Sequence, residues 1–82
     1  MTNVNLLENA NLRIKKLNKL KDIIKKSIKI LMDPAYNEFL IETNNYKELE
    51  SRHYEVSKYY ARLIEIKNEI KHIENYVLNT AE

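Results

Sequence analysis

Hydrophobic residues in the second half of the chain recur every three or four positions. This alternation is typical of the a/d seam of a helix that packs lengthwise against another helix. We refer to the residues that form the pattern as the seam: Val56, Tyr59, Leu63, Ile66, Ile70, Ile73 and Val77. The sequence therefore predicts a long helix over about residues 46–78, with the seam covered by a second helix.

A second amphipathic pattern runs through the first third of the chain. At about 100° per residue, one broad face collects Leu6, Ala10, Ile14, Leu17, Leu20, Ile24, Ile28 and Leu31. Asn5 and Glu8 have the spacing of a capping box, which predicts that Asn5 caps the start of this helix. We expect the helix to cover about residues 6–32, because Pro34 disfavours a helical conformation at the residue before it.

The segment between the two long patterns contains signals for a short helix and two turns. Asp33-Pro34 is typical of a helix start, with an N-cap followed by proline at the first helical position. A short helix is therefore expected over about residues 34–43. Asparagine favours caps over helix interiors, so Asn44-Asn45 is a candidate break before the last helix. Residues 34–78 form either one distorted helix or two helices, and we favour the break because it lets the last helix fold back along the first.

These elements predict a single all-α domain over residues 1–82, as a helical hairpin or three-helix bundle with coiled-coil-like packing. A chain of this length buries a thin core, and oligomerisation commonly supplements such a core. Apolar residues also lie outside the main face of each long helix: Leu12, Ile23, Ile30, Tyr60 and Ile64. We therefore expect a homodimer with a four- or six-helix bundle.

Composition and motifs argue against catalysis. The chain has no glycine and no cysteine, which excludes glycine-rich phosphate loops and thiolate chemistry. Glu50/His53 and Glu69/His72 have the Glu-x-x-His spacing of di-iron bundles, but both pairs lie on one predicted helix, whereas such sites need separate helices. We therefore expect no enzyme, no catalytic residue, no metal site and no cofactor.

Hydropathy and composition also bear on location and origin. No apolar run approaches the roughly 20 residues that span a bilayer, and no secretory signal pattern is visible. We expect a protein without a membrane span in the cytoplasm of a cell or of an infected host cell. Abundant Lys, Asn and Ile are typical of a phage or low-GC bacterial origin.

The charge is distributed unevenly along the chain. Residues 1–32 contain eight basic and two acidic side chains, a net of +6, whereas residues 33–82 contain six basic and ten acidic ones, a net of −4. Either the basic first helix packs beside the acidic remainder of its own chain, or it meets an external anion. The candidates for nucleic-acid contact lie opposite the apolar face: Lys15, Lys19, Lys26 and Lys29.

The function that these patterns favour is binding of another protein. We expect a small non-enzymatic helical module (an adaptor, a small chaperone or a phage- or virus-type inhibitor) that acts by helix–helix packing. Tyrosines are common anchors at protein interfaces. The predicted interface residues are Tyr54, Tyr59, Tyr60, Leu63, Ile66, Ile70, Ile73 and Val77. The alternative is a nucleic-acid-binding regulator that uses the lysine face of the first helix.

Overall fold

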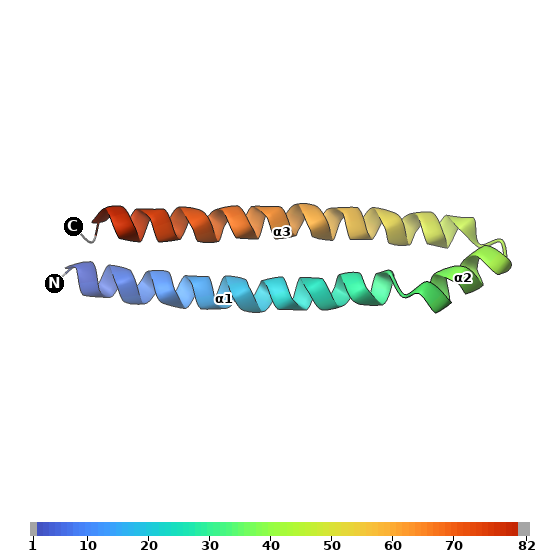
Figure 1. Ribbon diagram of the computed structural model, residues 1–82, viewed down its shortest axis with the longest axis horizontal. Helices are drawn as coiled ribbons and strands as arrows, with labels where there is room; N and C mark the ends of the chain where they lie inside the picture. The colour runs from blue at the N-terminus through green and yellow to red at the C-terminus, as the bar shows by residue number, and fades with distance from the viewer. Residues whose placement is uncertain (1, 81–82) are drawn as a thin grey trace.

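The protein is an antiparallel helical hairpin. The computed structural model describes the backbone of residues 2–80 and the side chains of residues 5–79. Within this range it contains no strand and three helices: α1 (Thr2–Leu31), α2 (Pro34–Glu42) and α3 (Tyr46–Thr80). α1 and α3 lie side by side and α2 forms the bend, in a rod of 63 × 15 × 13 Å (Figure 1). This arrangement confirms the predicted all-α hairpin.

The start of α1 and the end of α3 differ from the predicted boundaries by two or more residues. α1 begins at Thr2, so Asn5 lies inside its first turn and the predicted cap at Asn5 is wrong. The reason is that no residue before Asn5 opposes a helical conformation, and the N-cap preference of asparagine is too weak to stop the helix there. α3 ends at Thr80, about half a turn beyond the predicted end.

The chain leaves α1 just before Pro34 and enters α2 at Pro34, as the proline predicted. Leu31 is the last residue of α1, one residue before the predicted end. The backbone N–H of Asp33 donates to the carbonyl of Ile30 at 3.3 Å, which tightens the chain as it leaves the helix. Pro34 occupies the first turn of α2, as predicted, but the side chain of Asp33 makes no capping hydrogen bond.

The break between α2 and α3 is a Schellman motif built around asparagine. Asn44 has φ 58°, a left-handed conformation that glycine usually supplies and that asparagine tolerates. The N–H of Asn45 donates to the carbonyl of Leu40 at 2.8 Å, and that of Asn44 to the carbonyl of Ile41 at 3.0 Å. These two bonds satisfy carbonyls at the end of α2. Residues 34–78 therefore form two helices, as the sequence favoured.

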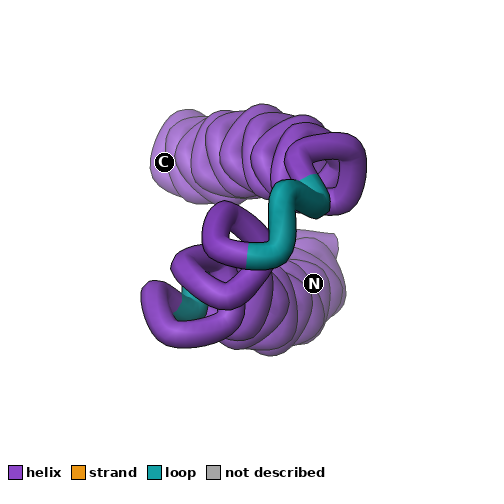
Figure 2. The backbone as a smooth tube through the Cα atoms, turned by 90° about the vertical axis from the view of Figure 1, so that its right-hand side faces the viewer, coloured by secondary structure: helices purple, strands orange, loops and turns teal. Residues whose placement is uncertain are grey.

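Asn45 caps the start of α3 with its side chain. Its Oδ1 accepts a hydrogen bond from the N–H of Glu48 at 3.4 Å. The N–H of Asn45 is already bound to Leu40, so the Glu48 carboxylate accepts hydrogen bonds from the side chains of Asn45 and Tyr36, both at 3.2 Å. Figure 2, which looks onto the bend, shows the short loops on either side of α2.

The core is a single layer of side chains between α1 and α3. Six buried residues form one cluster: Leu17, Ile24, Ile28, Val56, Leu63 and Ile66. Five half-buried side chains pack against it: Leu20, Leu31, Tyr59, Ile70 and Ile73. Ile66 has no exposed surface. The helix that covers the seam is thus α1 of the same chain.

Arg52 of α3 connects α1 and α2 through hydrogen bonds. Its Nη2 donates to the carbonyl of Ile30 at 2.9 Å, and its Nε donates to Oδ1 of Asn37 at 3.0 Å. Its guanidinium also lies 4.5 Å from the centre of the Tyr36 ring. A cation at the carboxyl end of a helix satisfies free carbonyls and interacts favourably with the helix dipole. One side chain of α3 thereby contacts both α1 and α2.

Candidate interaction surface

The predicted interface residues occupy three environments. Leu63 and Ile66 are buried in the core of the hairpin, and Tyr54 and Tyr60 are 62% and 49% exposed. The remaining four are half-buried: Tyr59, Ile70, Ile73 and Val77. Within this chain, Tyr54 and Tyr60 therefore offer the most side-chain surface to a partner. The prediction that the seam itself meets another protein stays a prediction.

The apolar residues outside the main helix faces are exposed, as their positions in the sequence indicated. Ile23 and Ile30 of α1 are 60% and 70% exposed, and Ile64 of α3 is 61% exposed. Leu12 and Tyr60 also present about half of their surface. These exposed apolar side chains on both long helices are surface that a second chain would bury on binding.

A groove runs between α1 and α3 on the flank that holds Tyr60 and Ile64. It has a volume of about 390 Å³ and is lined by Lys25, Ile28, Lys29, Tyr60, Leu63, Ile64 and Lys67. We call it the lysine groove. Ile28 and Leu63, each 7% exposed, form its floor. The hydroxyl of Tyr60 lies 3.8 Å from Sδ of Met32, so the exposed side chain of Met32 extends the apolar surface toward the bend.

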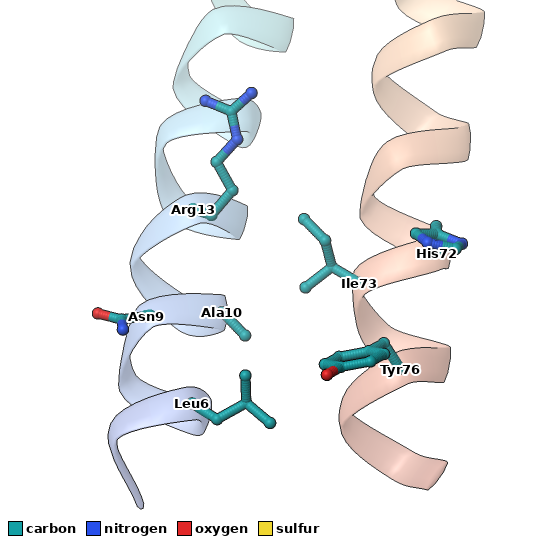
Figure 3. Close-up of a pocket in the computed structure, with 7 residues that line it drawn as sticks. All are labelled: Leu6, Asn9, Ala10, Arg13, His72, Ile73 and Tyr76. Carbon is teal, nitrogen blue, oxygen red and sulfur yellow. The ribbon is translucent and has the colours of Figure 1, made fainter. Parts of the chain in front are cut away.

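Two further grooves lie near the ends of the long helices. One, of about 420 Å³, is lined by Leu6, Asn9, Ala10, Arg13, His72, Ile73 and Tyr76. Figure 3 shows Leu6, Ala10 and Ile73 pointing between the helices, whereas Asn9 points away. The other, of about 290 Å³, is lined by Asn11, Ile14, Glu74, Val77 and Leu78.

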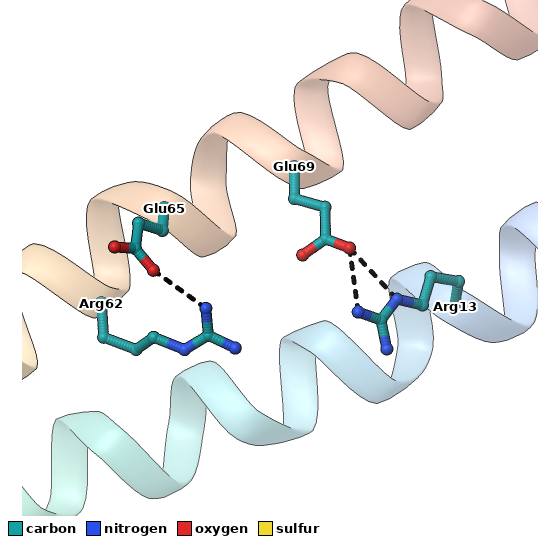
Figure 4. Close-up of polar contacts among 4 residues, drawn as sticks. All are labelled: Arg13, Arg62, Glu65 and Glu69. Atoms are coloured by element: carbon teal, nitrogen blue, oxygen red, sulfur yellow. Dashed lines mark hydrogen bonds and ion pairs between the residues drawn. The ribbon is translucent and has the colours of Figure 1, made fainter.

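Ion pairs account for little of the basic charge on α1. Arg13 donates to Oε1 of Glu69 from Nη2 at 2.9 Å and from Nε at 3.2 Å (Figure 4). Among the residues described, this is the one ion pair that joins α1 to α3. The pair between Arg62 and Glu65 lies within α3. Packing of basic α1 beside α3, which carries six basic and six acidic side chains, therefore neutralises one of the eight basic side chains in residues 1–32.

The lysines predicted to contact nucleic acid all lie on the exposed face of α1. They are Lys15, Lys19, Lys26 and Lys29. None of them makes an ion pair within the described part of the chain. Their charge is therefore available to an external anion.

The structure adds two lysines that the sequence analysis did not select. Lys25 and Lys67 border the lysine groove, whereas Lys29 is the one earlier candidate that lines it. Lys25 and Lys29 flank Ile28 at the edge of the apolar face, and this spacing was visible in the sequence. That Lys67 lies across from them depends on the register of α1 against α3, which the sequence pattern left open.

No metal site is evident in the part of the chain that the structure describes, where no three His, Asp or Glu side chains are grouped suitably. Glu69, a member of one predicted Glu-x-x-His pair, is bound to Arg13. None of the described helices combines the length and the hydrophobicity that crossing a membrane requires. Comparison with protein families, curated proteins and solved structures found no match to this chain. Function is therefore inferred from the exposed residues and grooves of the hairpin.

Proposed function

We propose that the chain is a non-enzymatic helical module that binds another protein by helix–helix packing, as an adaptor, a small chaperone or a phage- or virus-type inhibitor. The observation that supports this function is the ratio of exposed to buried apolar side chains. Within the described residues, seven hydrophobic side chains are buried, whereas fourteen large ones are at least 38% exposed. Monomeric proteins seldom expose extended apolar surface, and such surface commonly marks an interaction site.

The thin cross-section of the hairpin supports the same proposal. Stable domains generally pack two or more layers of secondary structure around a core, and the 15 × 13 Å cross-section here leaves the outer faces of both long helices uncovered. A second hairpin, from a different protein or from a second copy, would complete a four-helix bundle. We propose that the module works in the cytoplasm of a cell or of an infected host cell.

Two measurements test the proposal. Sedimentation of the full chain at about 5 and about 200 µM reports self-association by mass action. The full chain is also used to capture proteins from a nuclease-treated lysate of the source cells, and each captured protein is then purified and tested for direct rebinding. We expect self-association or direct rebinding of a protein. A chain that stays monomeric and rebinds no purified protein would contradict the proposal.

The unpaired lysines of α1 favour one second candidate, a nucleic-acid-binding regulator that uses Lys15, Lys19, Lys26 and Lys29. Binding that depends on phosphate contacts weakens steeply with salt, because it releases counterions. A gel-shift titration with duplex DNA and with RNA at increasing salt concentration separates the two functions. The second candidate predicts a shift that salt abolishes, and the first predicts no shift.

A further inference from the structure

We propose that the lysine groove is the docking site for an acidic amphipathic helix of the partner protein. The apolar stripe of that helix would pack on Tyr60 and Ile64, and its flanking carboxylates would pair with Lys25, Lys29 and Lys67. This inference rests on the proposed function and names the chemistry of the partner.

The shape of the groove fits a helix that lies along the hairpin. Two parallel walls, one from α1 and one from α3, enclose an apolar floor of Ile28 and Leu63. Helix-in-groove recognition places an apolar face into such a channel. Tyr60 and Ile64 lie on the α3 wall of the groove, with 49% and 61% of their surface exposed. Docking of a helix therefore removes apolar area from water. Tyrosine is also among the residues that contribute most at interfaces.

The charges identify which helix fits. Lys25 and Lys29 border the groove on α1, Lys67 borders it on α3, and no carboxylate lines it. None of the three makes an ion pair within the described residues. A partner helix with glutamate or aspartate on both sides of its apolar stripe would meet a cation on each wall. Such complementarity raises the association rate and disfavours basic partners.

The other two grooves lack this combination. The one near Arg13 contains a cation that Glu69 already neutralises, and the one near Ile14 contains the carboxylate of Glu74. An acidic helix therefore gains less at either of them.

A second copy of the chain is a poor occupant of the lysine groove. Symmetric pairing through this flank would place the lysines of one copy opposite the same lysines of the other, and juxtaposed like charges are costly. Nucleic acid would use the lysines but gains little from the aliphatic surface of Ile64, because phosphate contacts require cations and no apolar floor.

A synthetic peptide tests the inference on the full chain. The probe is a fluorescein-labelled helical peptide of about five turns, with leucines along one face and glutamates on both flanks. We expect it to bind, as measured by fluorescence anisotropy, and the K25E/K29E/K67E variant to bind it at least tenfold more weakly. The matched control K15E/K19E/K26E makes the same change of charge outside the groove and should change the affinity less than threefold.

A second matched pair tests the apolar contact. Ile64 and Ile23 are 61% and 60% exposed, but only Ile64 lines the groove. Ile64→Asp should weaken peptide binding at least tenfold and Ile23→Asp less than twofold. Circular dichroism checks that each variant is helical, and Ile64→Ser replaces Ile64→Asp if the latter is not. In NMR spectra of the wild type, the peptide should shift the amide signals of residues 25–32 and 60–67 most.

Several results would overturn the inference. These are no binding of the acidic peptide, equal binding of a peptide with lysines in place of its glutamates, or equal losses in the two isoleucine variants. Displacement of the peptide by duplex DNA, with equal losses in both lysine variants, would assign the groove to nucleic acid instead. If the K25E/K29E/K67E variant still rebinds a purified partner protein as tightly as the wild type, the docking site is wrong while the proposed function stands.

Discussion

The two halves of the hairpin differ in how completely the long helices cover each other. We define the bend half as residues 17–66 and the open half as residues 5–16 and 67–79. All seven buried hydrophobic residues belong to the bend half. The open half continues the same heptad spacing with Ile70, Ile73 and Val77, yet each of these remains half-buried.

The partners on α1 explain this difference. In the bend half the seam meets Leu17, Ile24 and Ile28, whereas in the open half α1 offers the half-buried Leu6 and Ile14 with the small side chain of Ala10 between them. Two grooves, of about 420 and 290 Å³, flank the helices in the open half, and the charged pair Arg13–Glu69 bridges the helices there. A regular seam on one helix therefore does not ensure burial, because the facing helix must supply matching volume.

The largest expected effect compares two isoleucines one heptad apart on α3. Ile66→Ala should lower the free energy of unfolding by about 3–5 kcal/mol, because it removes a fully buried side chain and leaves a cavity. Ile73→Ala removes the same atoms from a half-buried position and should cost about 1–2 kcal/mol. Urea denaturation followed by circular dichroism measures both. Equal losses would show that the open half is packed as tightly as the bend half, for example by self-association.

Arg52 tests how far polar contacts contribute to the bend half. Arg52→Ala removes two charge-assisted hydrogen bonds, to Ile30 and Asn37, and should cost about 2 kcal/mol. Arg52→Lys keeps the charge but loses the planar fork that spans both acceptors, so it should recover less than half of that loss. Thermal unfolding of the three proteins measures the difference. If Arg52→Lys were as stable as the wild type, the positive charge alone, through its interaction with the helix dipole, would account for the stabilisation by Arg52.

Substitutions of Asn44 test how much its left-handed backbone conformation, in the loop between α2 and α3, affects stability. Alanine lacks the short polar side chain through which asparagine tolerates the left-handed conformation, so Asn44→Ala should destabilise by about 1 kcal/mol. Asn44→Gly should be neutral or slightly stabilising, since glycine adopts positive φ freely. Denaturation midpoints of the two variants give the comparison. A loss in the glycine variant equal to that in alanine would place the contribution of Asn44 in its side chain.

Periodicity predicted most of the fold because the seam and its partner face were both readable from the sequence. The break at Asn44-Asn45 was also readable, since a chain without glycine depends on asparagine for a left-handed cap. The start of α1 was not readable, because several polar residues before Leu6 can serve as caps. The bond from Arg52 to Ile30 was equally hidden, since it needs the hairpin already formed.

The candidate site was less predictable than the fold. The a/d spacing singled out Leu63 and Ile66 as interface residues, but α1 covers both in the single chain. Spacing identifies a surface that packs on a helix and does not say to which chain that helix belongs. Lys67 was overlooked for a related reason, since a groove between two helices depends on their register.

The smallest expected effect concerns the polar contact of the open half. Arg13 and Glu69 are 53% and 38% exposed, and solvent and salt screen such pairs. A double-mutant cycle with Arg13→Ala and Glu69→Ala should therefore give a coupling of about 0.5 kcal/mol, which disappears at about 1 M salt. A coupling above about 2 kcal/mol would mean that the pair is desolvated, as it would be if a second chain covered the groove beside Arg13. The cycle thus also tests whether the open half is left open in solution.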